Sequence, residues 1–189
     1  MRMSQGKRII LLGMKHTGKS TLGALLADRL GVPFYDTDTV IAELAGKTPR
    51  ELYDEGGAPL MALHETGACR HLAALPRDTG MVIATGGGIS DNEEALGILK
   101  KTGLCVFLDT PEDIIFGRIM ASARRDGRLP RFLEGPDPRE IFHELFAHRS
   151  RTYATMADVR IATGSRKPDE LAKEITDYIE HEQRTHIHS

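Results

Sequence analysis

The eight residues from Gly13 to Ser20 carry the clearest chemical pattern in the sequence. They read Gly-Met-Lys-His-Thr-Gly-Lys-Ser and fit the pattern G-x-x-x-x-G-K-[ST]. In this pattern the glycines let backbone N–H groups approach phosphate oxygens, the lysine bridges the β- and γ-phosphates, and the hydroxyl binds Mg²⁺. A glycine-rich turn would need neither the lysine nor the hydroxyl. We therefore expect a site for ATP, with Lys19 catalytic, formed by Gly13, Thr17, Gly18, Lys19, Ser20 and Thr21.

Asp36 and Asp38 follow a short apolar run and are separated by one residue. Two carboxylates at a strand end can divide the work of phosphoryl transfer, because one can lie near Mg²⁺ while the other accepts the proton of a substrate hydroxyl. The alternative role is helix capping, for which aspartate is a preferred residue. Capping and catalysis are compatible, so both carboxylates are candidate site residues.

Two further segments could complete such a site. Thr85-Gly86-Gly87-Gly88 ends an apolar run, where backbone without side chains permits close approach of a ligand, although a flexible turn is the alternative. The segment from Arg124 to Pro138 holds arginines and chain breakers without a sustained apolar period, which predicts a mobile basic loop, and further arginines extend this cluster back to residue 118. Such a loop could close over ATP and neutralise charge on the transferring phosphoryl group, or it could be a solvated charged segment.

The elements that must position these residues alternate along the chain. Short apolar runs predict strands at 9–12, 32–35, 81–84, 104–108 and 159–162. Helical patterns follow them, with a capping box at Thr48, caps at Asp91 and Asp137, and a last helix from Pro168 through Ile179. Alternation of this kind gives a parallel sheet covered on both faces, with ligands at the carboxyl ends of the strands. The predicted fold class is α/β, a three-layer α/β/α arrangement around a five-stranded parallel sheet.

Composition narrows the class of protein. The 189 residues are 40% hydrophobic and 28% charged, and the formal net charge of −2 gives no general attraction to nucleic acid or anionic membrane. Cys69 and Cys105 lie in apolar stretches, which favours reduced thiols and a cytoplasmic location. The sequence has neither a signal-like segment nor an apolar run of 18 residues, so we expect no export or membrane insertion. We expect a monomer with one domain over 1–180, a polar tail at 181–189 and a small-molecule substrate.

Five blocks of the sequence, in order, resemble landmarks of the shikimate kinase family. They are GMKHTGKS at 13–20, FYDTD at 34–38, ATGGG at 84–88, FLDTPED at 107–113 and HRSRTYATMADV from 148. The resemblance covers nearly the whole chain. It implies a P-loop kinase fold of the nucleoside-monophosphate-kinase type, with a substrate-binding insertion at about 37–75 and a lid at about 122–138.

The same resemblance implies ATP-dependent phosphorylation of a hydroxyl on a small hydroxylated carboxylic acid, with shikimate as the first candidate. Ser20 and Asp36 would handle Mg²⁺, Asp38 would engage the substrate hydroxyl, and Arg149 would bind the substrate carboxylate. The other implied contacts are Gly86, Gly87 and Gly88 around the substrate, Arg118 and Pro168 near adenine, and Arg128 or Arg131 as the catalytic lid arginine.

One segment departs from the family pattern G-x-x-x-F-R-x-x-E. Counted from Gly56, Met61 stands in place of the arginine and His64 in place of the glutamate, with Glu65 one position further on. Methionine offers no equivalent of the bidentate arginine–carboxylate contact, which suggests a changed acceptor. A homoserine-like acceptor is the alternative, because its ammonium would suit an acidic pocket. A nucleotide-binding regulatory protein without catalysis is a third hypothesis, against which retention of Lys19 and Asp38 argues.

Overall fold

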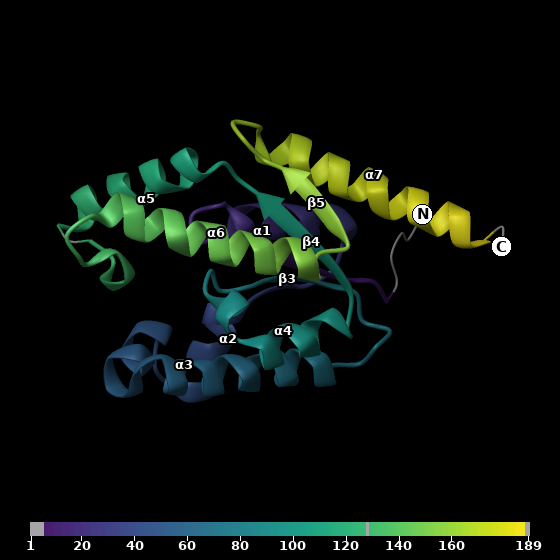
Figure 1. The fold of residues 1–189 in the computed structure, drawn as a ribbon. Helices are drawn as coiled ribbons and strands as arrows, with labels where there is room; N and C mark the ends of the chain where they lie inside the picture. The colour runs from purple at the N-terminus through teal and green to yellow at the C-terminus, as the bar shows by residue number, and fades with distance from the viewer. Residues whose placement is uncertain (1–5, 128, 188–189) are drawn as a thin grey trace.

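The computed structural model describes residues 6–127 and 129–187 and contains a five-stranded parallel sheet in the order β2-β3-β1-β4-β5 (Figure 1). The central strand β1 pairs with β3 on one side and β4 on the other, and the registers are parallel throughout. The strands are β1 (Arg8–Leu12), β2 (Phe34–Asp36), β3 (Met81–Ala84), β4 (Leu104–Asp109) and β5 (Val159–Ala162). The α-helices in the described part of the chain are α1 (Lys19–Leu30), α2 (Thr37–Ala45), α3 (Pro49–Ala74), α4 (Glu93–Lys100), α5 (Glu112–Asp126), α6 (Pro138–Met156) and α7 (Pro168–Ile187).

Alternate residues of β1 face two separate apolar layers, which makes the fold a three-layer α/β/α structure. Ile9 and Leu11 pack with buried residues of α1 and α7, whereas Ile10 and Leu12 pack with those of α2 to α6. A strand buried on both faces is expected to be apolar, as β3 is throughout and β1 is from Ile9 to Leu12. The predicted fold class is therefore confirmed.

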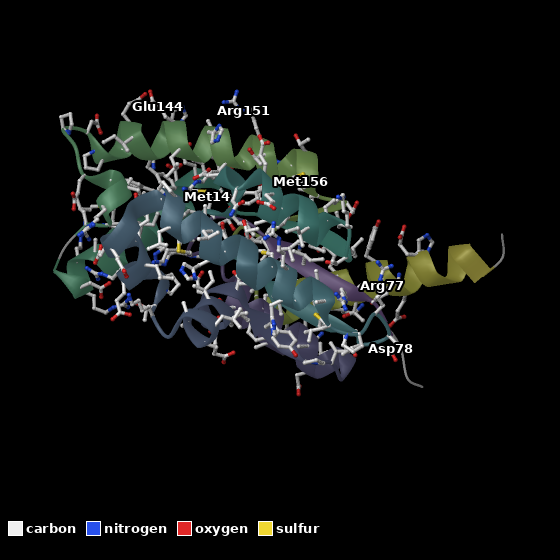
Figure 2. All side chains as sticks on the ribbon, turned by 90° about the horizontal axis from the view of Figure 1, so that it is seen from below. Met14, Arg77, Asp78, Glu144, Arg151 and Met156 are labelled. Carbon is white, nitrogen blue, oxygen red and sulfur yellow. The ribbon has the colours of Figure 1, made fainter. Side chains whose placement is uncertain are left out.

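The sheet directs the phosphate loop and the other strand-end segments to one edge. Met14 follows the carboxyl end of β1, while the turn at Arg77 and Asp78 precedes β3 and lies at the opposite end of the strands (Figure 2). Because all five strands are parallel, the loops after β1, β2 and β3 meet where ligands bind in open α/β sheets.

Several predicted element boundaries were wrong. Asn92, and not Asp91, caps α4, since the Asn92 side chain accepts a hydrogen bond from the Ala95 N–H. The second strand is Phe34–Asp36 and not 32–35, and α7 continues past residue 179 to Ile187 because its sequence contains no glycine or internal proline to end it. The predicted capping box at Thr48 and the cap at Asp137 are confirmed.

The two cysteines are buried, free thiols. Burial raises the pKa of the Cys69 thiol to about 12 and that of the Cys105 thiol to about 11, so both are protonated at neutral pH and pack as small apolar groups. Across residues 6–127 and 129–187, none of the helices combines the length and apolar character needed to cross a membrane.

The lid predicted over 122–138 is partly helical. α5 continues to Asp126 and ends at Gly127, whose φ of 74° places it in the left-handed region that glycine tolerates. A short 3₁₀ helix, η2 (Arg131–Leu133), follows, and α6 begins at Pro138. Arg128 lies outside the described residues.

Candidate active site

The phosphate loop connects β1 to α1 and leaves the first turn of α1 open. Gly18 precedes the helix with a φ of 92°, and no side chain caps the N-terminal N–H groups. The Lys19 ammonium donates to the carbonyls of Gly13 and Met14, each at 2.8 Å. Burial lowers the pKa of Lys19 to about 8, although the negative charges of Asp38 and Asp36 act in the opposite direction. Open helix N–H groups beside a buried lysine are suited to bind phosphate.

The predicted residues of this loop do not all face the same space. The Thr17 hydroxyl donates to the Met14 carbonyl at 2.9 Å, so it closes the loop. Ser20 and Thr21, by contrast, line a cavity of about 270 Å³ together with Lys19 and both aspartates. The structure thus brings most of the predicted phosphate site together around one cavity.

Asp36 both caps α2 and contacts the phosphate loop. Its Oδ1 accepts a hydrogen bond from the Asp38 N–H at 3.0 Å, and its Oδ2 accepts one from the Ser20 hydroxyl at 2.6 Å. Burial, together with the negative charge of Asp36, raises the pKa of Asp38. A hydroxyl and a carboxylate in direct contact are oxygen ligands of the kind that Mg²⁺ prefers, so these two side chains fit the metal predicted from the sequence.

The turn after β3 packs directly on the phosphate loop. The Gly86 N–H donates to the Thr37 hydroxyl at 2.8 Å, which fixes the start of the turn. A methyl group at Gly87 would lie only 2.5 Å from the backbone nitrogen of Lys15. Glycine is therefore required at position 87 by the close approach of two backbone segments.

Gly87→Ala should displace the turn from the phosphate loop, because backbone atoms cannot yield as a flexible side chain can. We expect a loss of about 1–3 kcal/mol in the free energy of unfolding, together with weaker nucleotide binding. Urea denaturation and calorimetric titration would measure the two effects. Gly117→Ala is the control, since that exposed helical position has open space and alanine favours helix. A G87A protein as stable as G117A would contradict the steric argument.

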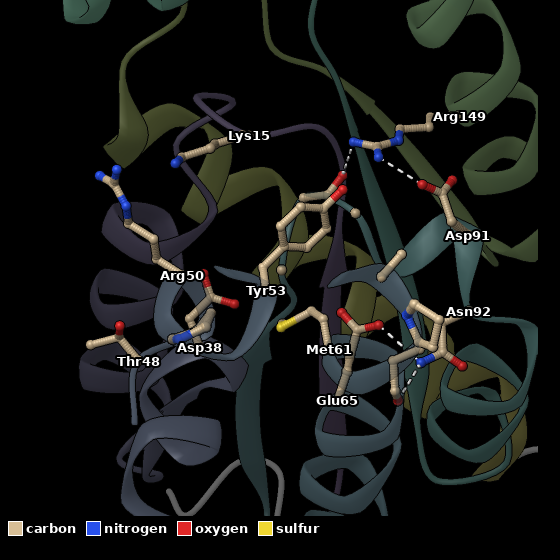
Figure 3. Close-up of a pocket in the computed structure, with 17 residues that line it drawn as sticks. Lys15, Asp38, Thr48, Arg50, Tyr53, Met61, Glu65, Asp91, Asn92 and Arg149 are labelled. Atoms are coloured by element: carbon tan, nitrogen blue, oxygen red, sulfur yellow. Dashed lines mark hydrogen bonds and ion pairs between the residues drawn. The ribbon is translucent and has the colours of Figure 1, made fainter. Parts of the chain in front are cut away.

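A second, larger cavity of about 740 Å³ (Figure 3) shares Lys15, Asp38, Gly86 and Gly87 with the first. It is lined by Lys15, Asp38, Thr48, Pro49, Arg50, Tyr53, Ala58, Pro59, Met61, Ala62, Glu65, Gly86, Gly87, Gly88, Asp91, Asn92 and Arg149. Asp38 lines both cavities, so its carboxylate lies where they meet. A cavity of this size suits a small-molecule ligand.

Arg149 reaches this cavity from α6 and is held by the turn after β3. Its guanidinium donates to the Gly87 carbonyl at 3.1 Å and to the Asp91 carboxylate at 2.6 Å, and the side chain is only 15% exposed. Tyr153, one turn further along α6, donates to the same carbonyl at 2.9 Å. Because these hydrogen bonds hold the guanidinium in place, Arg149 is positioned to contact an anionic group in the cavity.

The structure corrects the predicted arrangement of the divergent segment. α3 is kinked at Gly57, where φ is 65° and ψ is −158°. Beyond this kink Met61, Ala62 and Glu65 line the cavity, whereas His64 does not. The pattern G-x-x-x-F-R-x-x-E must therefore be counted from Gly57, which places Ala62 at the arginine position and Glu65 at the glutamate position. The glutamate is retained, whereas Ala62 replaces the arginine and Met61 replaces the phenylalanine of the pattern.

Glu65 is a buried carboxylate at the wall of the larger cavity. Its residue is 5% exposed, and its Oε2 accepts a hydrogen bond from the Asn92 amide at 3.0 Å. Burial raises the pKa of Glu65 to about 7. The hydrogen bond from Asn92 and the charge of Arg149 lower this pKa, whereas the charges of Asp38 and Asp91 raise it. Glu65 is thus poised to change charge near neutral pH.

Glu65→Gln should stabilise the protein at pH 8 and have little effect at pH 5. The native carboxyl releases its proton near pH 7 and the unfolded one near 4.5, so wild-type stability falls as pH rises through this window. Glutamine has no proton to release, so the variant avoids this fall in the free energy of unfolding, which amounts to about 1–3 kcal/mol. Urea denaturation from pH 5 to pH 8 tests this, with exposed Glu43→Gln as control. If the free energy of unfolding of E65Q and of wild type depends on pH in the same way, the prediction is wrong.

The remaining predicted residues that the structure describes do not line either of the two cavities. Arg118 donates to the His16 carbonyl at 2.8 Å, next to the phosphate loop. Arg131 contacts Asp54 of α3 at 2.9 Å, which joins the lid to the rim of the larger cavity. Pro168 begins α7, close in sequence to a cavity formed by residues 109, 111 and 162–166.

Sequence reasoning missed several residues of the larger cavity. Asp91 and Asn92 follow the triple glycine directly, so their position after a strand end was a usable signal. Lys15 lies within the phosphate-loop pattern at a position where the pattern accepts any residue. Arg50 and Tyr53 lie in the first turn and a half of α3, and nothing in their spacing marks them as site residues.

The parallel sheet has the strand order β2-β3-β1-β4-β5, the phosphate loop follows its central strand, and the carboxylates follow the next strand along the chain. These features define a phosphotransferase of the P-loop kinase fold. The family model for shikimate kinase matches residues 15–180. The chain therefore belongs to the shikimate kinase family.

Individual relatives agree with this assignment. The chain is 33% identical to the shikimate kinase of Aquifex aeolicus, over 89% of this chain and 93% of the relative. It is 35% identical to that of Symbiobacterium thermophilum, over 91% and 95%. The structure of Acinetobacter baumannii shikimate kinase in complex with shikimate is similar with a TM-score of 0.81 and 28% identity, over 93% of this chain and 94% of that one.

Proposed function

We propose that the protein transfers the γ-phosphoryl group of ATP to a hydroxyl of shikimate, giving shikimate 3-phosphate and ADP. The observation that carries this proposal is the position of Asp38, whose side chain lines both the phosphate cavity and the larger cavity. A carboxylate at that junction can meet an acceptor hydroxyl and the phosphoryl group at once. Membership of the shikimate kinase family supports the choice of acceptor.

In the proposed reaction the acceptor oxygen forms a bond to the γ-phosphorus, and the bond from that phosphorus to the β–γ bridging oxygen breaks. The hydroxyl proton passes to the Asp38 carboxylate, whose raised pKa makes it a better base than an ordinary aspartate. Lys19 leaves its loop carbonyls to contact the β- and γ-phosphates. Its charge then offsets the negative charge that gathers on the transferring group.

Ser20 and Asp36 would hold Mg²⁺, which when bound neutralises the phosphates of ATP. Backbone N–H groups from Gly13 to Thr21 would surround those phosphates. Arg118 and Pro168 would lie near adenine, and Arg131 or Arg128 would approach the phosphoryl group from the lid. Arg149, held by Asp91, would bind the acceptor carboxylate while Gly86 to Gly88 and Met61 line its pocket.

We further propose that the enzyme acts in the cytoplasm as a monomer and without nucleic acid. The buried free thiols are consistent with a reducing compartment, and the near-neutral net charge offers no general attraction to polyanions.

An ADP-release assay with Mg²⁺ and ATP over shikimate, gluconate and other hydroxylated acids tests the proposal. We expect shikimate to stimulate ADP release well above the rate with ATP alone. Tight ATP binding without stimulation by any acceptor would instead indicate a nucleotide-binding regulatory protein. Calorimetric titration with ATP separates that result from a protein that has lost its fold.

A further inference from the structure

Lys15 lies where the phosphate cavity meets the larger cavity. Four residues line both cavities: Lys15, Asp38, Gly86 and Gly87. Lys15 is the cation of this set, and Asp38 is its carboxylate. A phosphoryl group that passes from ATP in one cavity to an acceptor in the other must cross the place that these residues share. A positive charge at this place is therefore positioned to act on the transferring group.

The backbone of Lys15 is held by the phosphate loop on one side and by the turn after β3 on the other. Within the loop, the Thr17 hydroxyl and the Thr17 N–H donate to the Met14 carbonyl at 2.9 and 3.4 Å, which closes a tight turn around Lys15. A methyl group at Gly87 would lie 2.5 Å from the Lys15 backbone nitrogen and 2.9 Å from its Cα. The base of the Lys15 side chain is thus fixed, so its ammonium can reach only a limited region of the two cavities.

The Lys15 ammonium is not engaged by another group of the protein. In the part of the chain that the structure describes, no hydrogen bond or ion pair involves its Nζ, and the residue is exposed. The other cations near the site are already engaged: Lys19 by two loop carbonyls, and Arg149 and Arg131 by carboxylates. Lys15 can therefore bind an anionic ligand without first breaking a contact within the protein.

The phosphate cavity offers few positive charges for the phosphates that it would bind. Among the described residues that line it, the side chains that can carry positive charge are Lys15, His16 and Lys19. Burial lowers the pKa of His16 below its ordinary value of 6.5, and the charges of Lys15 and Lys19 lower it further, so His16 is neutral at pH 7. The charge of Lys15 adds to the burial that lowers the pKa of Lys19 and acts against the burial that raises the pKa of Asp38. Lys15 is thus within electrostatic reach of both catalytic groups.

We infer that Lys15 is a second catalytic cation, whose ammonium contacts the transferring phosphoryl group on its acceptor side and remains in contact with the phosphate of the phosphorylated product. This inference rests on the proposed phosphoryl transfer to shikimate and adds a residue to it. Lys19 serves the β- and γ-phosphates from within the loop. Lys15 and Arg149 lie on opposite sides of the larger cavity, so an acceptor whose carboxylate is held by Arg149 can extend its hydroxyl toward Lys15 (Figure 3).

In this step the acceptor oxygen forms a bond to the γ-phosphorus, and the bond from that phosphorus to the β–γ bridging oxygen breaks. The hydroxyl proton goes to Asp38, and ADP leaves. Lys15 keeps its protons and donates a hydrogen bond to a non-bridging oxygen of the phosphoryl group. Because negative charge moves with this group from one cavity to the other, a cation beside both cavities stabilises the transition state more than the bound substrates.

The first test measures the chemical step by rapid quench in a single turnover with saturating shikimate. Lys15→Met keeps a side chain of similar length without the charge, and we expect it to slow phosphoryl transfer by about 10- to 100-fold, the value of one charge-assisted hydrogen bond. Lys15→Arg should recover most of this loss. Lys101→Met is the matched control, because the Lys101 side chain is also exposed, has no hydrogen bond or ion pair within the described residues and lines neither cavity.

The second test separates contact with the phosphoryl group from contact with the acceptor carboxylate. Calorimetric titration gives the dissociation constants of shikimate and of shikimate 3-phosphate for wild type and K15M. We expect the dissociation constant of shikimate 3-phosphate to rise about tenfold in K15M, while that of shikimate changes by less than about threefold. An equal rise for both compounds would place Lys15 on a part that they share, such as the carboxylate, and would overturn the inference.

The remaining outcomes separate this inference from the proposed function. A K15M enzyme that transfers the phosphoryl group at nearly the wild-type rate would also overturn the inference, but it would leave the proposed function intact. If the wild-type enzyme binds ATP and does not phosphorylate shikimate, the proposed function fails and this inference fails with it. Dissociation constants do not depend on the fraction of folded protein, so partial unfolding of a variant cannot imitate the expected result.

Discussion

Lys19→Ala should lower kcat for phosphoryl transfer by about 100- to 1000-fold, because the loop would lose the cation nearest the transferring group. The ammonium is already desolvated and held beside the cavity by two carbonyls, so it is at the phosphate site before nucleotide binds. Alanine leaves those carbonyls able to bind water, and the fold should persist. Steady-state ADP release with saturating ATP and acceptor measures the change.

Lys173→Ala is the matched control for this prediction. Lys173 lies on the exposed face of α7 and pairs with Asp177 of the same helix, so its removal should leave kcat unchanged. Circular dichroism should show the same helix content in both variants. A K19A enzyme that keeps kcat within about threefold of wild type would remove Lys19 from the catalytic site, since the loss of such a group is worth far more.

Asp38→Asn should lower kcat by about 100- to 10,000-fold while leaving ATP binding nearly intact. Asparagine has the same size and polarity but cannot accept the hydroxyl proton. The α2 cap is preserved, because it is made by the Asp36 side chain and the backbone N–H of residue 38. Rapid-quench measurement of phosphoryl transfer gives the chemical step, and calorimetric titration gives the dissociation constant of ATP.

The exposed residue Asp28 of α1 provides the control Asp28→Asn, which should match wild type in both measurements. Loss of ATP binding in D38N to the same extent as the loss in kcat would assign Asp38 to the nucleotide site and not to the acceptor hydroxyl. Full activity in D38N would show that no protein base is needed at this position.

The features that could be predicted from sequence are those set by local chemistry. The phosphate loop is a contiguous pattern that needs only a preceding strand and a following helix, and both are present. Helix capping was expected for an aspartate of the pair Asp36 and Asp38, and Asp36 makes that cap with one carboxylate oxygen while the other accepts from the Ser20 hydroxyl. Short runs of four or five residues predicted the five strands of the parallel sheet, most clearly at β3, which is apolar and fully buried.

The features that could not be predicted depend on tertiary register. Whether His64 or Glu65 faces the cavity is decided by the kink at Gly57, since a shift of one residue turns a helical side chain by about 100°. Asp91 was expected to cap α4, but its carboxylate is engaged by Arg149 from a helix almost sixty residues away. The contact of Arg131 with Asp54 likewise joins segments whose proximity the sequence does not reveal.

The shape of the cavity determines how the divergent segment is interpreted. Counting from the wrong glycine suggested that both arginine and glutamate had been replaced, as expected for an acceptor site rebuilt as a unit. The structure shows instead that the glutamate is retained as Glu65, which is buried at the cavity wall and hydrogen-bonded to Asn92, while Ala62 stands at the arginine position. The chemical question thus changes from how a rebuilt site binds a different acceptor to how the acceptor carboxylate is bound without an arginine at position 62.

Direct identification of the product by ³¹P and ¹H NMR is the most decisive measurement. The enzyme is incubated with Mg²⁺, ATP and shikimate, and phosphorylated shikimate is quantified against ADP, with K19A as the blank. We expect one shikimate 3-phosphate for each ADP in the wild-type reaction and almost none in the blank. ADP formed without phosphorylated shikimate, or no ADP from an enzyme that binds ATP, would contradict the proposed phosphoryl transfer to shikimate.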